Sequence, residues 1–228
     1  MVLKPVEWVE GENEFGRYAV PTSSQHRPAA RGILWGQVWE RETLAFMRAH
    51  AGRRDIVHAG LYFGDFLPGL SKAVGADNVI YGFEPNPENF FCARLTALLN
   101  KLPNVRLYEV GLSDRAGRRI MRVADDGVAR GGVSYVVEAA PEAASPDFQE
   151  IATATIDGIV PAMADIGIIQ LDIEGLEAEA LRGGMKTIQR CRPILILETV
   201  LQEMVEQILM PLGYRDRGKA GCNTIYAV

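Results

Sequence analysis

The chain has 228 residues, 48% of them hydrophobic and 23% charged, with a formal net charge of −5 at pH 7. This length allows a single domain with a large core, and the acidic balance argues against a nucleic-acid groove as the main binding surface. No run approaches the length of a membrane span, and the mixed, acidic N-terminus lacks a secretory signal. The cysteines Cys92, Cys191 and Cys222 are scattered in apolar sequence, which favours buried thiols in a reducing compartment. We therefore expect a cytoplasmic protein that has neither a membrane nor a nucleic acid as a partner.

The first fifty residues precede the regular part of the chain. Residues 1–31 show no sustained hydrophobic period, so we expect an irregular arm or lid. Trp8, Phe15 and Tyr18 are too many aromatics for a disordered tail, so the arm should fold over a pocket or pack on another subunit. Residues 32–50 have apolar positions at helical spacing. We assign residues 1–50 to this arm and helix and 51–228 to a single domain.

The rest of the chain is organised around residues 55–65. A short buried strand over 55–59 enters a turn that Gly60 and Gly64 bracket, and a helix is expected over 66–74. Glycine lets the backbone approach a ligand closely, and the helix start presents free N–H groups, so this pattern is typical of a nucleotide-type pocket. The next strand, over 78–83, ends at Glu84, where such folds hold a ribose through both of its hydroxyls.

Further strands and helices alternate along the chain, and repeated βα units predict a doubly wound, mostly parallel sheet. We expect helices over 87–100, 176–189 and 202–210, long strands over 105–112, 166–172, 193–197 and 223–228, and short strands over 118–123, 133–137 and 151–155. An insert at about 118–150 has no place in this sheet and should cover the substrate. Ser134 in the insert is a candidate substrate contact, with an ordinary hairpin turn as the alternative.

Seven sequence blocks between residues 55 and 198 follow one another in a familiar order. They are His58-Ala59-Gly60-x3-Gly64, Phe83-Glu84-Pro85-Asn86-Pro87, Gly111-Leu112-Ser113-Asp114, Thr155-Ile156-Asp157, Leu171-Asp172-Ile173-Glu174-Gly175-x-Glu177, Leu181-Arg182-Gly183 and Arg192-Pro193-x4-Glu198. Together they resemble the FkbM family of S-adenosylmethionine-dependent methyltransferases. The resemblance implies an α/β, Rossmann-like class I methyltransferase fold: a seven-stranded, mostly parallel sheet with an antiparallel last strand and helices on both faces. It also implies methyl transfer, usually to a hydroxyl oxygen.

The resemblance also implies which residues hold S-adenosylmethionine. Glu84 would bind the ribose, and Ser113 and Asp114 would meet the adenine unless they form only a turn. The full set of expected cofactor contacts is His58, Ala59, Gly60, Tyr62, Glu84, Pro85, Asn86, Leu112, Ser113, Asp114 and Asp172.

His58 stands where the family's first motif usually has an acidic residue. It is a candidate general base, a candidate cofactor ligand or a satisfied core histidine. Histidine lacks the fixed negative charge that would meet the ammonium of the cofactor. We expect His58 to be neutral there, and cofactor binding to weaken as the pH falls and the imidazole gains a proton.

The candidate reaction centre is acidic. Asp172 ends a central strand at the edge of the sheet where ligands bind. We assign Asp172 and Glu174 to catalysis together with His58, and Glu198, which ends the neighbouring strand, to the substrate. No histidine or asparagine accompanies these carboxylates at ligand spacing, so we predict no metal.

The predicted function is O-methylation of a hydroxyl on a small acceptor, a sugar or a secondary metabolite, with a homodimer left open. Two other classes stay open. One is a non-catalytic S-adenosylmethionine-binding protein. The other is a nicotinamide-dependent oxidoreductase, which is disfavoured because residues 59–65 lack the first glycine of Gly-x-Gly-x-x-Gly.

Overall fold

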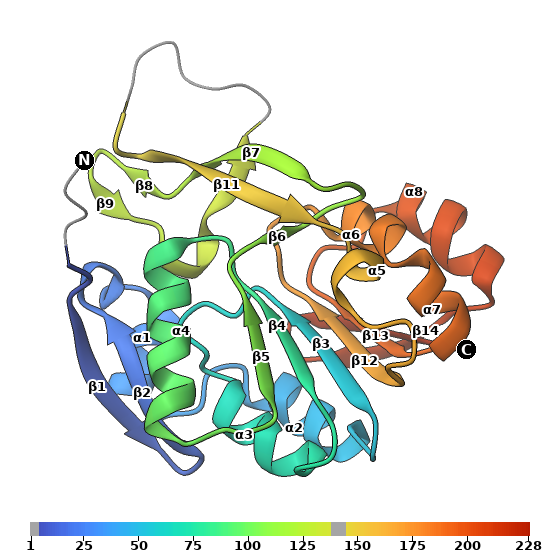
Figure 1. The fold of residues 1–228 in the computed structure, drawn as a ribbon, viewed down its shortest axis with the longest axis horizontal. Helices are drawn as coiled ribbons and strands as arrows, with labels where there is room; N and C mark the ends of the chain where they lie inside the picture. Colours follow the sequence, from blue (N-terminus) through green and yellow to red (C-terminus); the bar gives the residue numbers. More distant parts are fainter. Residues whose placement is uncertain (1–4, 138–144) are drawn as a thin grey trace.

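A seven-stranded sheet crosses the molecule in the computed structural model, which describes residues 5–137 and 145–228 (Figure 1). Its strand order is β14–β15–β13–β12–β3–β4–β5. The bounds are β3 Asp55–Ala59, β4 Ile80–Phe83, β5 Val105–Tyr108, β12 Ile166–Leu171, β13 Ile194–Leu197, β14 Arg215–Ala220 and β15 Asn223–Ala227. β15 pairs antiparallel with both β13 and β14, and the other strand pairs of this sheet are parallel. The predicted fold class, with its antiparallel last strand, is confirmed.

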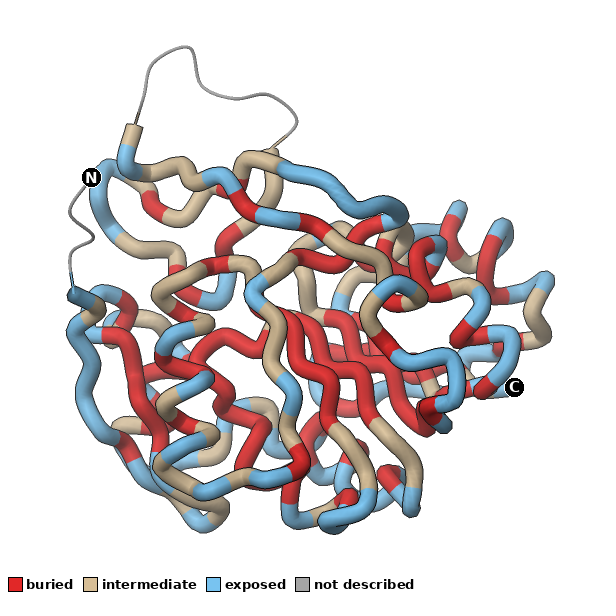
Figure 2. The backbone as a smooth tube through the Cα atoms, viewed as in Figure 1, coloured by how far each residue is buried: buried red, intermediate tan, exposed pale blue. Residues whose placement is uncertain are grey.

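Helices cover both faces of this sheet, and the central strands between them are buried (Figure 2). One face packs against α2 (Arg41–His50) and α3 (Leu67–Val74), and α4 (Pro87–Leu99) lies beside α3. The other face packs against α5 (Ile156–Ile159), α6 (Glu177–Gly183), α7 (Met185–Cys191) and the segment that follows α8 (Gln202–Met204). In residues 5–137 and 145–228, no helix combines the length and the apolar character needed to cross a membrane.

Alternation along β3 and β12 decides which side chains face each helical layer. Ile56 and Ile168 pack on the α2–α3 side, whereas Val57 and Ile169 pack on the other. The same alternation turns His58 and its cross-strand neighbour Gln170 towards the α2–α3 side. Two buried polar side chains therefore stand side by side on the α2–α3 side of the sheet.

The insert forms a second sheet of four strands in the order β10–β7–β11–β6. Its strands are β6 Gly111–Leu112, β7 Gly117–Arg122, β10 Tyr135–Val137 and β11 Phe148–Ala154, and a small hairpin pairs β8 Ala124–Asp125 with β9 Val128–Ala129. The strand predicted over 105–112 is therefore wrong as one element, because β5 ends at Tyr108 and β6 pairs with β11 instead. In Figure 1, β7 and β11 lie above the central sheet. Residues 138–144 of the predicted insert lie outside the described residues.

The N-terminal arm is regular, contrary to the expectation of an irregular segment. It contains the hairpin β1 (Trp8–Asn13) and β2 (Gly16–Pro21), the 3₁₀ turn η1 (Thr22–Ser24) and α1 (Pro28–Leu34). β2 packs on α4, and Tyr18 is buried with its ring edge-on to Phe63. The helix expected over 32–50 is broken, because Gly36 and Glu40 take positive φ values between α1 and α2.

The C-terminal segment also departs from its predicted elements. After α8, residues 205–209 form a π-helical turn (η3), and Met210–Leu212 form a 3₁₀ turn (η4). β14 was not among the predicted strands, because its residues are mostly exposed and polar and show no apolar alternation. Cys222, in the turn between β14 and β15, is exposed, so the expected burial holds only for Cys92 and Cys191.

Candidate cofactor and active site

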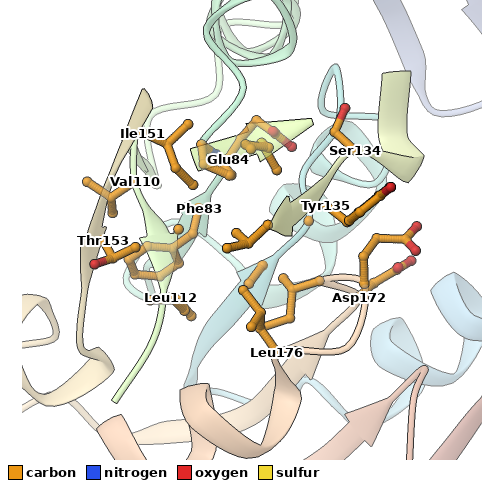
Figure 3. A pocket seen from close by; sticks show the side chains of 18 of the residues that line it. Phe83, Glu84, Val110, Leu112, Ser134, Tyr135, Ile151, Thr153, Asp172 and Leu176 are labelled. Atoms are coloured by element: carbon orange, nitrogen blue, oxygen red, sulfur yellow. The ribbon is translucent and has the colours of Figure 1, made fainter. Parts of the chain in front are cut away.

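Two adjoining cavities lie at the carboxyl ends of β3, β4 and β12, and they share Gly60, Gly132, Asp172 and Glu174 as lining residues. The narrow cavity, of about 40 Å³, lies between the strand ends and the insert (Figure 3). Glu84, Leu112, Ser134 and Tyr135 line it. The wide cavity, of about 360 Å³, is lined by His58, Tyr62, Asp65, Gln170 and Glu198, among others. Carboxyl ends of parallel strands are where open α/β sheets bind ligands.

Gly60 lies where the two cavities meet and lines both of them. Its φ is +84°, and a Cβ added there would lie 1.9 Å from the carbonyl oxygen of Asp172. A side chain is therefore excluded both by conformation and by space.

Glu84 follows β4 and lies in the narrow cavity, with 5% of its surface exposed. Its two carboxylate oxygens accept hydrogen bonds from the backbone N–H groups of Tyr62 and Asn86, each at 2.9 Å. Burial raises the pKa of Glu84 to about 7, against the lowering effect of these two donors. Each oxygen keeps a further lone pair, so the carboxylate can still accept from two neighbouring hydroxyls.

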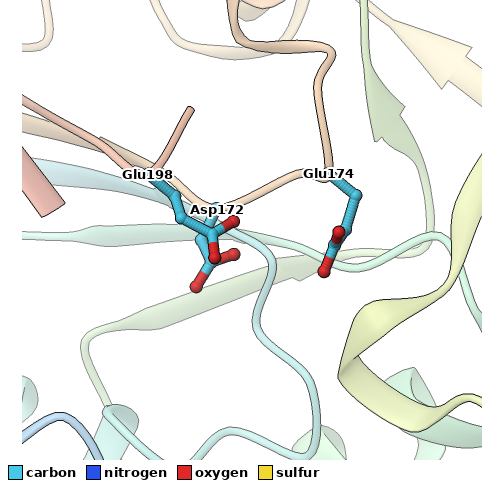
Figure 4. A group of neighbouring side chains, drawn as sticks. All are labelled: Asp172, Glu174 and Glu198. Carbon is cyan, nitrogen blue, oxygen red and sulfur yellow. The ribbon is translucent and has the colours of Figure 1, made fainter. Parts of the chain in front are cut away.

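Three carboxylates gather where β12 and β13 end. Asp172, Glu174 and Glu198 each offer an oxygen, and these atoms lie within 4.8 Å of one another. Figure 4 shows the Asp172 and Glu198 carboxylates beside each other, with Glu174 facing them from the following loop. Burial, and then the hydrogen bond with Glu198, raise the pKa of Asp172, so this carboxyl group holds a proton more tightly than an ordinary one does. The spacing also suits a metal ion, so the predicted absence of a metal stays a prediction.

Asp65, a residue that the sequence analysis did not single out, adds another carboxylate to the wide cavity. It directly follows Gly64, and 8% of its surface is exposed. Burial, and then the nearby charge of Glu40, raise the pKa of Asp65 to about 7.

His58 is buried at the end of β3, with 2% of its surface exposed. Its Nδ1 contacts Oε1 of Gln170, and its ring stacks on Phe66 with the centroids 5.3 Å apart. Burial lowers the pKa of His58 to about 4, so the imidazole is neutral at physiological pH. The expected loss of binding through protonation of His58 therefore moves to pH values near 4.

A family model described as a methyltransferase FkbM domain matches residues 58–218, more than two thirds of the chain. The chain belongs to the FkbM methyltransferase family.

Solved structures share the fold of this FkbM chain. The FkbM methyltransferase of Methylobacillus flagellatus is 17% identical with a TM-score of 0.51, and the match covers 78% of this chain and 44% of that one. The Pyrococcus abyssi tRNA (uracil-54, C5)-methyltransferase, in complex with S-adenosyl-L-homocysteine, is 11% identical with a TM-score of 0.50, covering 96% and 43%. This chain thus spans less than half the length of either protein. Comparison with curated proteins gives no match.

S-adenosylmethionine is the cofactor of this FkbM methyltransferase, and the geometry fits it. Each Glu84 oxygen in the narrow cavity accepts one backbone hydrogen bond and can accept another, so the geometry allows the predicted contact with the ribose hydroxyls. Gly60 lines both cavities, and the Asp172 carbonyl packed against it leaves no space for a side chain. Ala59, Pro85 and Leu112 also line the narrow cavity, and Tyr62 lines the wide one.

Four other predicted side chains have different surroundings. Ser134, expected at the substrate, lies in the narrow cavity, where its hydroxyl donates to the carbonyl of Gly131 at 2.8 Å. Asn86 caps α4 by accepting from the backbone N–H groups of Glu88 and Asn89. Ser113 donates to Glu179 at 2.8 Å. Within the described part of the chain, Asn86, Ser113 and Asp114 line neither cavity, so their contacts with the cofactor remain predictions.

The arm and the insert close over the FkbM site together. The Tyr62 hydroxyl donates to Ser24 of the arm at 2.7 Å, and the Arg27 guanidinium donates to the carbonyl of Ala129 in the insert at 2.9 Å. Arg27 also lines the wide cavity. The aromatic side chains of the arm predicted that it folds over a pocket or packs on another subunit, and these contacts place it beside the wide cavity. Neither Gln170 nor Arg27 was among the predicted site residues. Gln170 is the only polar residue in the apolar run 166–171, and this exception in the sequence could have marked it as a candidate site residue.

Gly60→Ala should weaken binding of S-adenosylhomocysteine by at least roughly 10-fold, because the methyl group displaces the Asp172 carbonyl and strains a positive φ. Titration calorimetry measures the effect. Gly127→Ala, which also has a positive φ (78°) but no atom within 4 Å of the added Cβ, is the matched control. Equal affinity of Gly60→Ala and wild type would show that the close packing of Gly60 against the Asp172 carbonyl does not shape the cofactor site.

The free energy of unfolding of the ligand-free protein should fall as the pH rises from about 4 to about 7. Burial raises the folded-state pKa of Glu84 from 4.5, and that of Asp65 from 3.8, to about 7, so the folded protein binds more protons than the unfolded chain in this window. Each group contributes a slope of up to about 1.4 kcal/mol per pH unit. Urea denaturation at several pH values measures it. Asp65→Asn should make the profile shallower, with the contribution of Glu84 retained, and an unchanged slope would contradict the burial of an ionisable Asp65.

Proposed function

We propose that this FkbM methyltransferase methylates a hydroxyl oxygen of a small polar acceptor, such as a sugar or a secondary metabolite, that binds in the wide cavity. The observation that carries this proposal is the Asp172–Glu198 carboxyl pair beside Gly60. A hydroxyl becomes a good nucleophile only as it loses its proton, and a positioned carboxylate within reach can accept that proton.

Bound S-adenosylmethionine supplies an electrophilic methyl group. Burial and the neighbouring Glu198 raise the pKa of Asp172, so an ionised Asp172 is a stronger base than an ordinary carboxylate and can take the proton from the acceptor. Glu174 faces them, and burial followed by the charge of Glu198 raises its pKa, which makes it a second acceptor for protons. A neutral His58 with a pKa of about 4 is a weak general base, which favours its role in binding over its role in catalysis.

The lining of the wide cavity supports a polar acceptor of modest size. Arg27, Arg130 and Glu40 offer hydrogen-bonding groups, and Trp39 offers an apolar ring face. A ring bearing several hydroxyls fits such a surface, because polar edges and an apolar face meet it at once.

The replacement of the usual acid by His58 favours one rival, a protein that binds S-adenosylmethionine without catalysis. A mass-spectrometric screen of hydroxylated acceptors with S-adenosylmethionine separates the two. A product heavier by one methyl group supports the proposal, and its position on oxygen follows from fragmentation. S-adenosylhomocysteine binding without any methylated product across sugars, phenols and polyols would favour the rival. Methylation on nitrogen or carbon alone would overturn the O-methyl assignment.

A further inference from the structure

His58 and Gln170 form a buried polar pair that the reaction proposed above does not use. They are register partners on the neighbouring parallel strands β3 and β12, and both line the wide cavity. Gln170 is 1% exposed and His58 2%. A buried polar atom without a hydrogen-bond partner costs free energy, and Nε2 of His58 is such an atom among the described residues.

The contact between them fixes which ring nitrogen carries the proton. Oε1 of Gln170 is a carboxamide oxygen and can only accept, so Nδ1 of His58 must donate to it. A neutral imidazole has one N–H, which leaves Nε2 with a bare lone pair. Nε2 is buried and, among the described residues, has no hydrogen-bond partner. Stacking on Phe66 fixes the plane of the ring, so the lone pair has a set direction.

The part of S-adenosylmethionine beyond the ribose matches this atom. If Glu84 holds the ribose in the narrow cavity, the amino-acid end extends past Gly60 into the wide cavity that His58 lines. That end carries an ammonium group, which only donates, and a carboxylate, which only accepts. An Nε2 that can only accept suits the ammonium and rejects the carboxylate.

We infer that Gln170 is a positioning residue that holds His58 as its Nδ1–H tautomer, so that Nε2 accepts a hydrogen bond from the ammonium of S-adenosylmethionine. This inference rests on the cofactor assignment given above. The wide cavity already contains five carboxylates: Glu40, Asp65, Asp172, Glu174 and Glu198. A sixth at position 58 would add like-charge repulsion, whereas a neutral acceptor keeps the direction of the hydrogen bond without the charge. The carboxylates already present balance the ammonium.

The tautomer can be observed directly in the full-length protein. The chain contains only His26, His50 and His58, so ¹⁵N-histidine labelling gives three resolvable imidazoles, and the spectrum of His58→Asn assigns the third. We expect His58 to show a protonated Nδ1 and an unprotonated Nε2, and saturation with S-adenosylhomocysteine to shift the Nε2 signal. Gln170→Leu should shift the tautomer equilibrium towards Nε2–H. A wild-type His58 with its proton on Nε2 would overturn the inference.

Binding of two probes tests which ligand atom is involved. S-adenosylhomocysteine carries the ammonium, and 5′-methylthioadenosine lacks the whole amino-acid end. His58→Asn keeps an N–H at the place of Nδ1, able to donate to Gln170, but removes the Nε2 atom. We expect it to bind S-adenosylhomocysteine roughly 10-fold more weakly, as for a lost hydrogen bond to a charged group, and 5′-methylthioadenosine as tightly as wild type does. His58→Gln places an amide oxygen near the Nε2 position and should recover part of the loss.

Equal losses for the two probes, or no loss for either, would overturn the role of His58 towards the ammonium. A variant that binds S-adenosylhomocysteine normally but loses turnover would overturn it too, because His58 would then act on the acceptor. Wild-type protein that binds neither probe would instead contradict the placing of the cofactor in these cavities, which is a separate failure.

Discussion

Asp172→Asn should lower the turnover number of methyl transfer by roughly 10²- to 10⁴-fold, the range expected for loss of a general base. An asparagine has nearly the same shape but cannot take up a proton, so the Asp172–Glu198 pair would lose the carboxylate that receives the proton of the acceptor. Asp172 lines both cavities, so the change also reaches the cofactor, but its effect on the affinity for S-adenosylhomocysteine should be much smaller than its effect on turnover.

Single-turnover kinetics with an acceptor from the screen, alongside calorimetric titration of S-adenosylhomocysteine, separates these two effects. Glu109→Gln is the matched control, because Glu109 is an exposed carboxylate just after β5 that lines neither cavity among the described residues. Asp172→Asn with wild-type turnover would exclude Asp172 as the base. Glu198→Gln would then show whether the other member of the pair takes its place.

Glu84→Ala should weaken binding of S-adenosylhomocysteine by about 2–3 kcal/mol, which corresponds to roughly 30- to 160-fold in Kd. The truncation removes both acceptors from the narrow cavity. It also leaves the backbone N–H groups of Tyr62 and Asn86 without their carboxylate partner, so the free energy of unfolding should fall by about 1–3 kcal/mol.

Calorimetry on the folded variant, with thermal unfolding measured in parallel, distinguishes lost binding from lost structure. If Glu84 holds the ribose, 5′-methylthioadenosine should lose affinity as much as S-adenosylhomocysteine does, unlike the pattern expected for His58→Asn. Glu109→Ala, a truncation of the carboxylate after the next strand, should bind both ligands as wild type does. An unchanged Kd in a folded Glu84→Ala protein would remove the ribose assignment.

Much of the fold followed from local sequence patterns. Residues 55–59 form β3 as predicted, because an apolar run before a glycine turn has few alternatives to a buried strand. Pro87 starts α4, where its missing N–H costs nothing and Asn86 supplies the cap. The segments that were predicted wrongly lack such a pattern. The hairpin over 8–21 is held by the packing of β2 on α4, and the polar edge strand β14 forms because β15 pairs with it.

The sequence by itself determined that Glu84, Asp172 and Glu198 would share one edge, because each ends a strand of a parallel sheet, and all three line the two cavities. Only the tertiary structure decided how the acidic groups and His58 are protonated, because burial and neighbouring charges set those pKa values. The tertiary structure also decided which side chain supports His58, the residue at the position of the family's acid. Gln170 lies 112 residues from His58 along the chain, and only the pairing of β3 with β12 brings the two side chains together.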